Sequence, residues 1–552
     1  MPRHRDSKHR FRAIHPASTV SGDVSAPATN LGPALKFAVV AICCIVAAPV
    51  LAENWRTSAS ASATETYTTN VDYAPQGQET GDFVSTLSAA LNIHGEGARV
   101  KFNGSIAASW LLYARQSQNN SVAPSVNLLG SVEAIEKFAF VEASANVSTS
   151  FLSPFGPQPA SLVNATNNRY TSQVYTVSPY IQGVLGSTNI SYQVRDDNYW
   201  TVASSYGNSS NKVPNTYANQ LNAYMNSGTN PVGWRLEYNR LYYDNGIQSG
   251  IDGSNVSLGN YTVQVARAIV SHQIDPQLQV SARVGYEKEQ FPLTNSQGMI
   301  YGAGMQWSPT ERTQLGGFWE HQFFGSAFSW QFSHRLPNAA INANFTRGIT
   351  SYPQLAVGIP AGANVSQFLD AAFTTRIPDP AARAQAVDEF LAQTGLPPTL
   401  AAPANFYGTS ISLQNVQTVS LVLIGVRNSI TFSVFNVMSD AISGKGDVLP
   451  PALQFGQNYT QTGAGVGYSH RLSGLTSLTA NASYFRSVTN QTSLNNVRSN
   501  NGYAGLTLST KFAPKTTGSA GVNYSIFQPT GQINSSNTSS VNIYVGIAHT
   551  FW

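Results

Sequence analysis

The chain has 552 residues, with 31 Lys and Arg against 27 Asp and Glu and a formal net charge of +4 at pH 7. Six of these basic residues and two of the acidic ones lie in residues 1–52, so removing them leaves 25 of each sign. The rest of the chain is electrically balanced, and a nucleic-acid partner, which requires a basic surface, is not expected. Both cysteines, Cys43 and Cys44, also lie in this leader, which excludes a disulfide framework from residues 53–552.

Residues 1–52 have the features of a secretory signal peptide with an unusually long basic leader. An apolar run from Phe37 to Leu51 follows the basic residues, and Val50-Leu51-Ala52 offers a small-residue cleavage site. A transmembrane helix needs about 20 apolar residues, and this run is shorter. We therefore predict an exported protein whose mature part is residues 53–552, while the sequence leaves open whether Met1 is the true start.

The mature part alternates apolar and polar residues with a period of two. Along residues 278–287 the even positions are mostly apolar and the odd positions polar, and the same pattern recurs along the chain. We predict about 22 strands (20–24), which begin near residues 58, 82, 98, 124, 138, 169, 188, 216, 231, 258, 277, 297, 311, 326, 338, 408, 428, 456, 475, 499, 516 and 539.

The connections between these strands differ in length in a regular way. Joins after even-numbered strands are short, such as Gly95-Glu96-Gly97, whereas those after odd-numbered strands are mostly long, such as 151–168. Short turns at one end and long loops at the other are typical of bacterial outer-membrane barrels, and a soluble β-sandwich has no reason to sort its loops this way. The predicted fold is an all-β, transmembrane, antiparallel up-and-down β-barrel over residues 53–552, surrounded by outer-membrane lipids of a Gram-negative cell.

The last residues are predicted to form the strand that closes the barrel. One face of this strand carries Val541, Ile543, Val545 and Ile547. Phe551 lies on the same face, whereas Trp552 lies on the opposite face. A terminal aromatic strand of this kind is typical of the signal that the barrel-assembly machinery recognises. Phe551 and Trp552 are therefore the candidate assembly signal.

Residues 352–407 interrupt the β pattern with two predicted helices. Asp379 is expected to cap the second helix, because Pro380 follows at the first helical position. The apolar stripes contain four residues that could plug or cap the lumen: Phe368, Phe373, Phe390 and Leu391. The insertion follows an odd-numbered predicted strand, so it belongs to an extracellular loop. The sequence does not decide whether it plugs the lumen or only caps the loop.

The polar faces of the strands carry charges that alternate in sign. The candidate lumen-lining residues are Lys101, Arg195, Arg235, Glu237, Arg283, Glu287, Glu320 and Arg335. They could close the lumen with salt bridges or hold an electric field across a water-filled passage. Arg267 is the exception, because it shares a face with Val263 and Val265, which we assign to lipid. An Arg facing lipid at the midplane costs about 2–4 kcal/mol, so a bulge, a rim position or another register is expected there.

The sequence predicts no enzyme, cofactor or metal site. It contains no Gly-x-Ser-x-Gly elbow, no His-Glu-x-x-His motif and no phosphate loop. Asp196-Asp197 is a carboxylate pair that is better explained by a solvated rim than by acid–base catalysis. Glu320 and His321 are neighbours on a strand, so they are expected to point to opposite faces.

Three stretches resemble the outer-membrane proteins associated with the PEP-CTERM/exosortase system. They are Ser58–Val100, Ser153–Gly183 (SPFGPQPASLVNATNNRYTSQVYTVSPYIQG) and Ile377–Leu400 (IPDPAARAQAVDEFLAQTGLPPTL). The resemblance implies a location in the outer membrane. It also implies a link either to exopolysaccharide and its export machinery or to protein sorting. It implies no catalytic residues.

Two functions follow as hypotheses. The first is a porin-like passage for export or surface assembly of a polysaccharide. The alternative is a non-conducting structural or docking barrel that binds polysaccharide or a partner protein through its extracellular loops. A plugged, energised transporter is disfavoured, because few residues separate Ala52 from the first predicted strand.

Removing Phe551 and Trp552 is expected to impair assembly of the barrel, because it shortens the strand that the assembly machinery would recognise. Heat-modifiable migration of the outer-membrane fraction, which separates folded from unfolded barrels, measures this. Normal amounts of folded, truncated protein in the outer membrane would contradict the assignment.

Overall fold

The computed structural model describes most of the chain from residue 54 onward. The described residues are 54–205, 215–228, 231–244, 247–249, 255–257, 260–291, 295–357, 365–374, 377, 379, 382–383, 386–387, 389–391, 406–408, 411–442, 458–490, 497–531 and 536–551. The predicted signal peptide, residues 1–52, and Trp552 lie outside them.

The fold is a 22-stranded antiparallel sheet closed on itself. Its strands are β1 (Asn54–Thr68), β2 (Asp82–Glu96), β3 (Val100–Tyr113), β4 (Ser121–Ile135), β5 (Ala139–Phe151), β6 (Arg169–Val184), β7 (Ser191–Ser205), β8 (Thr216–Asn226), β9 (Val232–Asp244), β12 (Asn260–Asp275), β13 (Leu278–Gln290), β14 (Asn295–Thr310), β15 (Thr313–Gln322), β16 (Gly325–Leu336), β17 (Ala339–Thr350), β18 (Ser412–Ile424), β19 (Asn428–Ala441), β20 (Tyr459–Arg471), β21 (Thr476–Thr489), β22 (Arg498–Ala513), β23 (Thr516–Thr530) and β24 (Thr538–Thr550). A separate two-stranded ribbon, β10 (Ile247–Ser249) and β11 (Asn255–Ser257), lies between β9 and β12 in the sequence.

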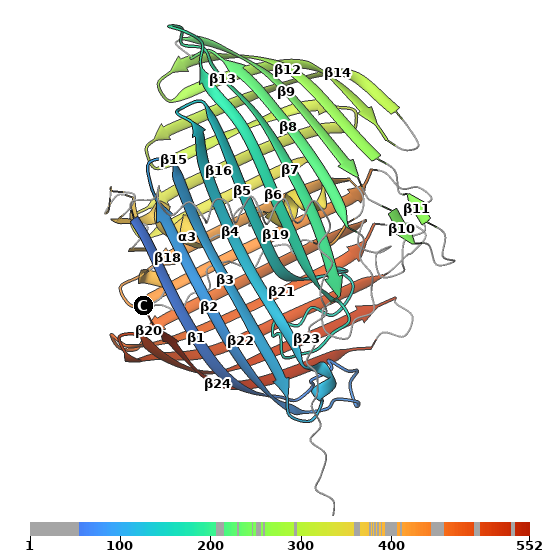
Figure 1. Ribbon diagram of the computed structural model, residues 1–552, viewed down its shortest axis with the longest axis vertical. Coiled ribbons are helices and arrows are strands. Elements are labelled where there is room, and N and C mark those ends of the chain that lie inside the picture. Colours follow the sequence, from blue (N-terminus) through green and yellow to red (C-terminus); the bar gives the residue numbers. More distant parts are fainter. Residues whose placement is uncertain are drawn as a thin grey trace, which may run out of the picture.

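The barrel closes where β1 pairs with β24. Tyr67 lies opposite Ile543, and the pairing runs from Ser60–Thr550 to Thr68–Asn542. Beyond the strand, the Phe551 N–H donates to the carbonyl of Ala59 at 2.8 Å. Figure 1 shows the blue strands β1–β4 crossing in front of the orange and red strands β18–β23, as expected for tilted strands on opposite walls. The predicted fold class is confirmed, and each predicted strand start lies within four residues of an observed one.

The two faces of the sheet differ in polarity. Residues directly opposite each other on paired strands share a face, so the register carries one assignment around the whole barrel. On β24, Ile543, Val545 and Ile547 are 57%, 61% and 50% exposed, whereas Asn542 on the other face is 2% exposed. Apolar residues therefore cover the outer surface and polar residues face the lumen, which is the arrangement of a barrel in lipid.

Within the described residues, α-helices occur in the connection between β17 and β18. They are α2 (Tyr352–Val357), α3 (Val365–Phe373) and short helical stretches within residues 382–391. A short 3₁₀ turn, η2 (Ser117–Asn119), precedes β4. No helix in the described part of the chain is long and apolar enough to cross a membrane.

Glycines allow strands β14 and β15 to bend sharply against each other. A Cβ atom on Gly302 would lie 2.2 Å from the carbonyl oxygen of Trp319 and 2.8 Å from the Cα atom of Glu320. Both are backbone atoms of the neighbouring strand, so a side chain cannot be accommodated without moving the sheet. Gly298, four residues earlier on the same face of β14, has nothing within 4 Å of its virtual Cβ.

Gly302→Ala is expected to lower the free energy of unfolding by about 1–3 kcal/mol, because it overpacks a position that the backbone of β15 occupies. Gly298→Ala on the same strand is the matched control and is expected to change it by less than about 0.5 kcal/mol. Urea unfolding of the barrel in detergent or lipid measures both. Equal effects of the two substitutions would contradict the close approach.

Candidate functional site

All eight charged residues that the sequence assigned to the lumen lie on the inner face of the barrel. They are Lys101, Arg195, Arg235, Glu237, Arg283, Glu287, Glu320 and Arg335. Two are at the periplasmic rim, where Lys101 Nζ lies 3.9 Å from Glu96 Oε1 and Arg335 donates a hydrogen bond to the carbonyl of Glu311. The other six lie on β7–β15, so the charge is concentrated on one side of the lumen.

A cluster of largely buried charges lies at the bend of the sheet. Glu320 on β15 accepts hydrogen bonds from Arg267 on β12, at 2.8 Å from Nη2 and 2.9 Å from Nε. Strands β13 and β14 lie between them, but Gly285 opposite Arg267 and Gly302 opposite Glu320 have no side chain to block the contact. Arg283 Nη1 lies 3.7 Å from the second carboxylate oxygen of Glu320. The side chain of Glu320 is 1% exposed, so these charges hold the bend together instead of lining open water.

The assignment of Val263 and Val265 to lipid is wrong, and Arg267, as expected, does not face lipid. Val263 and Val265, which share its face, are buried in the lumen in contact with a group of residues that includes Ile300 and Tyr261. The sequence misleads here because apolar residues on a barrel strand usually mark the lipid side, whereas these are covered from inside. No bulge or rim position is needed, since Arg267 has a carboxylate partner.

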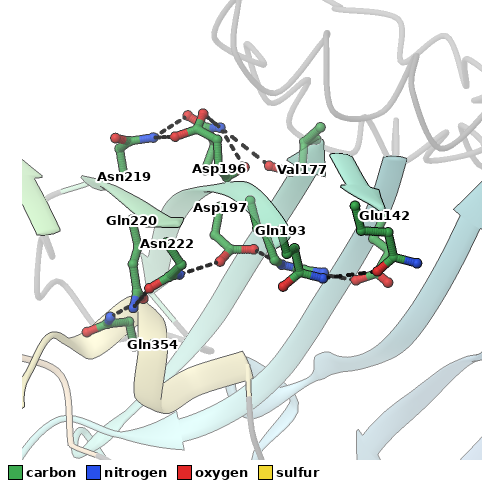
Figure 2. Close-up of polar contacts among 12 residues, drawn as sticks. Glu142, Val177, Gln193, Asp196, Asp197, Asn219, Gln220, Asn222 and Gln354 are labelled. Atoms are coloured by element: carbon green, nitrogen blue, oxygen red, sulfur yellow. Dashed lines mark hydrogen bonds and ion pairs between the residues drawn. The ribbon is translucent and has the colours of Figure 1, made fainter. Parts of the chain in front are cut away.

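A second ion-pair network lies on β5, β7 and β8. Arg195 Nη2 lies 2.6 Å from Glu142 Oε2, and Arg195 Nε lies 2.7 Å from Asp197 Oδ1. Figure 2 shows two hydrogen bonds on the lumen side of these strands: Asn222 donates to Asp197, and Gln354 of α2 donates to Gln220. The network therefore connects the barrel wall to the β17–β18 connection.

The expectation that Asp196-Asp197 forms a solvated carboxylate pair at a rim is also wrong. Both residues lie near the middle of β7 and point to opposite faces, with Asp197 in the lumen and Asp196 on the outer surface (Figure 2). Glu320 and His321 behave as the sequence indicates, because His321 stacks on the outer-face Tyr301 at 5.3 Å between ring centroids.

Sequence analysis missed several inner-face charges: Glu142, Asp197, Arg267 and Glu289. Glu289 could have been found from the period of two, because it lies two residues after Glu287 on the same face. Both carboxylates are buried, and Glu287 accepts a hydrogen bond from the backbone N–H of Phe323. No group of three or more metal-binding side chains occurs among the residues that the structure describes.

The connection between β5 and β6, residues 152–168, folds into the lumen and reaches the seam between β1 and β24. Asn164 is fully buried at the inner side of the β1–β24 seam. Its Nδ2 donates to Thr68 Oγ1 at 3.0 Å and Ser540 Oγ at 2.9 Å, and its Oδ1 accepts from Asn542 Nδ2 at 2.8 Å. We call this set of contacts the Asn164 latch.

Other contacts fix the shape and place of this inward loop. Arg169 is 2% exposed, and its two terminal nitrogens donate to the carbonyls of Pro159, Ser161, Leu162 and Asn164. The loop also reaches β22, where Asn501 Oδ1 accepts from the Gln158 N–H and Ser499 Oγ donates to the Pro154 carbonyl. Sequence analysis counted this segment among the long external loops, although its apolar residues Leu152, Phe155 and Val163, all buried in the structure, were a signal of burial.

The β17–β18 connection fills a second part of the lumen from the same end. Tyr352 of α2 is hydrogen-bonded to Tyr170 and Ser172 on β6, and its ring contacts Tyr407. Burial raises the pKa of the Tyr407 hydroxyl well above its usual value, so it stays protonated throughout the physiological pH range. The two connections therefore meet inside the barrel.

The helical part of this connection packs on the inner wall. Val365, Leu369 and Val387 contact the inner-face residue Val422 of β18. Of the residues predicted to plug or cap the lumen, Phe373, Phe390 and Leu391 pack against this group, and the two phenyl rings meet edge to face at 5.6 Å. The side chain of Phe368 lies outside the described part. Asp379 caps the second helical stretch as predicted, accepting from the Ala382 N–H at 3.3 Å.

The wall opposite the charged strands is almost uncharged. Within the fully described strands β18–β24, charged residues on the inner face occur only at the periplasmic ends, as Arg471 and Lys511. The remainder carries mostly hydroxyl and amide side chains, including Thr418, Ser433, Gln461, Asn481, Ser483, Asn501 and Asn523. A cavity of about 330 Å³ separates part of this wall from the inward loop, bordered by Gln461, Phe485, Tyr503 and Gln158.

No family model matches the chain, and no curated protein does. Similar solved structures include the FrpB iron transporter from Neisseria meningitidis (10% identity, 90% of this chain and 82% of that chain, TM-score 0.46). The siderophore receptor PirA from Acinetobacter baumannii is another (9% identity, 90% and 80%, TM-score 0.42). A ferric enterobactin receptor mutant from Pseudomonas aeruginosa in complex with enterobactin is a third (11%, 89% and 81%, TM-score 0.41).

The class of this protein follows from its own geometry. The closed sheet leaves no backbone edge, its outer surface is apolar and its inner face is polar. Only helices and closed barrels satisfy the backbone in lipid, and barrels of this size with an apolar outer band belong to outer membranes. The chain is an outer-membrane β-barrel of a Gram-negative cell.

Glu320→Gln is expected to destabilise the barrel by about 3–5 kcal/mol, because it leaves the buried guanidinium of Arg267 without a carboxylate. Glu96→Gln is the control, since its side chain and that of its partner Lys101 are 64% and 70% exposed and such a pair contributes about 1 kcal/mol or less. Urea unfolding of both variants measures the difference. Similar losses would show that the Glu320 cluster does not hold the bend.

Proposed function

We propose that the protein is a gated, porin-like passage that serves the export or surface assembly of a polysaccharide. In the closed state the inward loop, residues 152–168, and the described residues of the β17–β18 connection occupy the lumen. The observation that carries this proposal is the Asn164 latch, whose side-chain hydrogen bonds, together with one backbone hydrogen bond from Ala165 to Val71, hold the inward loop to the β1–β24 seam without strand pairing. Each such bond contributes about 0.5–1.5 kcal/mol net, so the loop can leave the wall while the barrel stays closed.

The uncharged wall of β18–β24 supports a neutral, hydroxyl-rich polymer as the cargo. Amide and hydroxyl side chains exchange hydrogen bonds with sugar hydroxyls, and aromatic rings offer apolar faces. The ring of Tyr544 lies over Gly521 on the inner face and is partly exposed, so it offers one aromatic surface on this wall. The resemblance to outer-membrane proteins of the PEP-CTERM/exosortase system agrees with this cargo, and with exopolysaccharide export machinery and the barrel-assembly machinery as partners. No catalytic role is proposed.

The second candidate is a docking barrel that binds polysaccharide or a partner protein without conducting. The depth of the plug favours it, because Tyr352, Tyr407 and Asn164 are all almost completely buried. In this case the inward connections are permanent parts of the core. The two candidates differ in whether the plug leaves the lumen.

Asn164→Ala is expected to raise ion conductance in planar lipid bilayers several-fold, because it removes the latch while leaving the barrel intact. Replacing residues 154–166 by a short Gly-Ser linker is expected to give a larger, permanently open conductance. Ala160→Ser in the same loop is the control, because the Ala160 side chain makes none of the latch hydrogen bonds.

Absence of conductance in both the latch variant and the linker variant would contradict the passage. Normal polymer export but altered surface retention in a deletion strain would then support the docking barrel.

A further inference from the structure

The outer wall of β7 and β8 carries a polar cluster on a surface that otherwise faces lipid. Asp196 Oδ1 accepts from Asn219 Nδ2 at 2.8 Å, and Asp196 Oδ2 accepts from Asn198 Nδ2 at 2.8 Å. The hydroxyl of Tyr217 donates to Asn198 Oδ1 at 2.7 Å. Figure 2 shows Asp196 and Asn219 on the opposite side of the strands from Asp197 and the lumen residues.

The register places this cluster deep in the membrane. A row of opposite residues leads from Val100, at the periplasmic end of β3, across β4, β5 and β6 to Asp196 on β7. The same row continues through Arg240 on β9 to Lys288 near the extracellular end of β13, so it climbs around the barrel. Each strand adds about 3 Å of height for a spacing of about 4.8 Å and a tilt of about 40°. Asp196 therefore lies about 12 Å above Val100 in an apolar band about 25 Å tall.

The charges on this row have no partner of opposite sign within the described chain. Asp196 is hydrogen-bonded to amides but to no cation, and Arg240, two strands away, makes no hydrogen bond or ion pair with a described residue. A charge that faces lipid is costly and usually has a partner within the membrane. Here an acid and a base are both left facing outward on one patch.

We propose that a second copy of this chain docks on this patch, the outer wall of β7–β9 centred on Leu221, to form a two-fold dimer in the membrane. Leu221 lies directly between Asp196 and Arg240 in the register. A two-fold axis along the membrane normal near Leu221 brings Asp196 of each copy opposite Arg240 of the partner subunit. Such an interface uses the same surface on both copies, so it must be self-complementary, and a patch with one acid and one base meets that condition.

The distances on the patch allow this pairing. Asp196 and Arg240 are two strand spacings apart, about 10 Å, which places Arg240 about 6 Å higher in the membrane. An extended Arg side chain spans that difference, and the apolar side chains of Val194 and Leu236, 38% and 50% exposed, flank the charges. The inference is independent of the proposed passage, because it concerns the outer wall and not the lumen.

A charge exchange tests the dimer directly. Light scattering and native mass spectrometry of the purified barrel in detergent give its mass. The wild type is expected to be a dimer, and Asp196→Arg and Arg240→Asp are each expected to weaken dimerisation at least tenfold. The double variant D196R/R240D restores complementarity between copies and is expected to regain the dimer. Heat-modifiable migration confirms that each variant is folded.

Cross-linking in intact outer membranes provides a second readout. Leu221→Cys, in a chain carrying Cys43→Ala and Cys44→Ala, is expected to form a disulfide-linked dimer on mild oxidation. Leu506→Cys on the lipid-facing side of β22 is the matched control and is expected to remain monomeric. A monomeric wild type, equal cross-linking at both positions, or a D196R/R240D variant that stays monomeric would each overturn the proposal.

Discussion

The whole structure depends on the hydrogen bonds between β1 and β24. In lipid an unpaired backbone group costs several kcal/mol, so a sheet of this size is stable there only if its first and last strands meet. That requirement fixes an even number of antiparallel strands and sends the end of the chain back to its starting rim. It also explains why an apolar, alternating strand ends the chain, and why the inward loop is anchored by Asn164 at this same seam.

Closure creates a lumen that polar side chains alone do not fill. A barrel of 22 strands is wide, and wide barrels hold either water or a plug. Here the plug comes from connections between strands, and each connection is buried by a different chemistry. Residues 152–168 are held through backbone carbonyls gathered by Arg169, whereas the β17–β18 connection is held by tyrosine hydroxyls and apolar helices. A cavity of about 330 Å³ remains between the inward loop and the uncharged wall.

The strands, their number and the closing pair could be predicted from the sequence, because alternation and turn length are local signals. The same alternation of polar and apolar residues predicted that the eight charged residues lie on the inner face. The errors arose where a distant segment changes what a face touches. Val263 and Val265 are apolar because lumen residues cover them, and that cover cannot be inferred from β12 itself. The burial of Asn164 depends on Thr68 and Asn542, which are remote in sequence, so no local pattern could reveal the latch.

The structural role of a charged residue in a barrel depends on the face and the depth at which it lies, as Asp196 and Arg267 show. Arg267 shares a face with valines that were assigned to lipid, and it proved to have a buried carboxylate partner, so its charge is neutralised within the chain. Asp196 was assigned to solvent and proved to face the membrane at mid-depth with only amide donors around it. The two errors have different causes: Val263 and Val265 beside Arg267 are covered by lumen residues, whereas the depth of Asp196 was misjudged because the shear of the sheet carries a residue several ångströms up or down for each strand crossed. Depth is therefore a property of the assembled register and not of a residue's distance from the end of its own strand. A charge whose depth is known and whose partner is missing points to a second protein surface in the membrane.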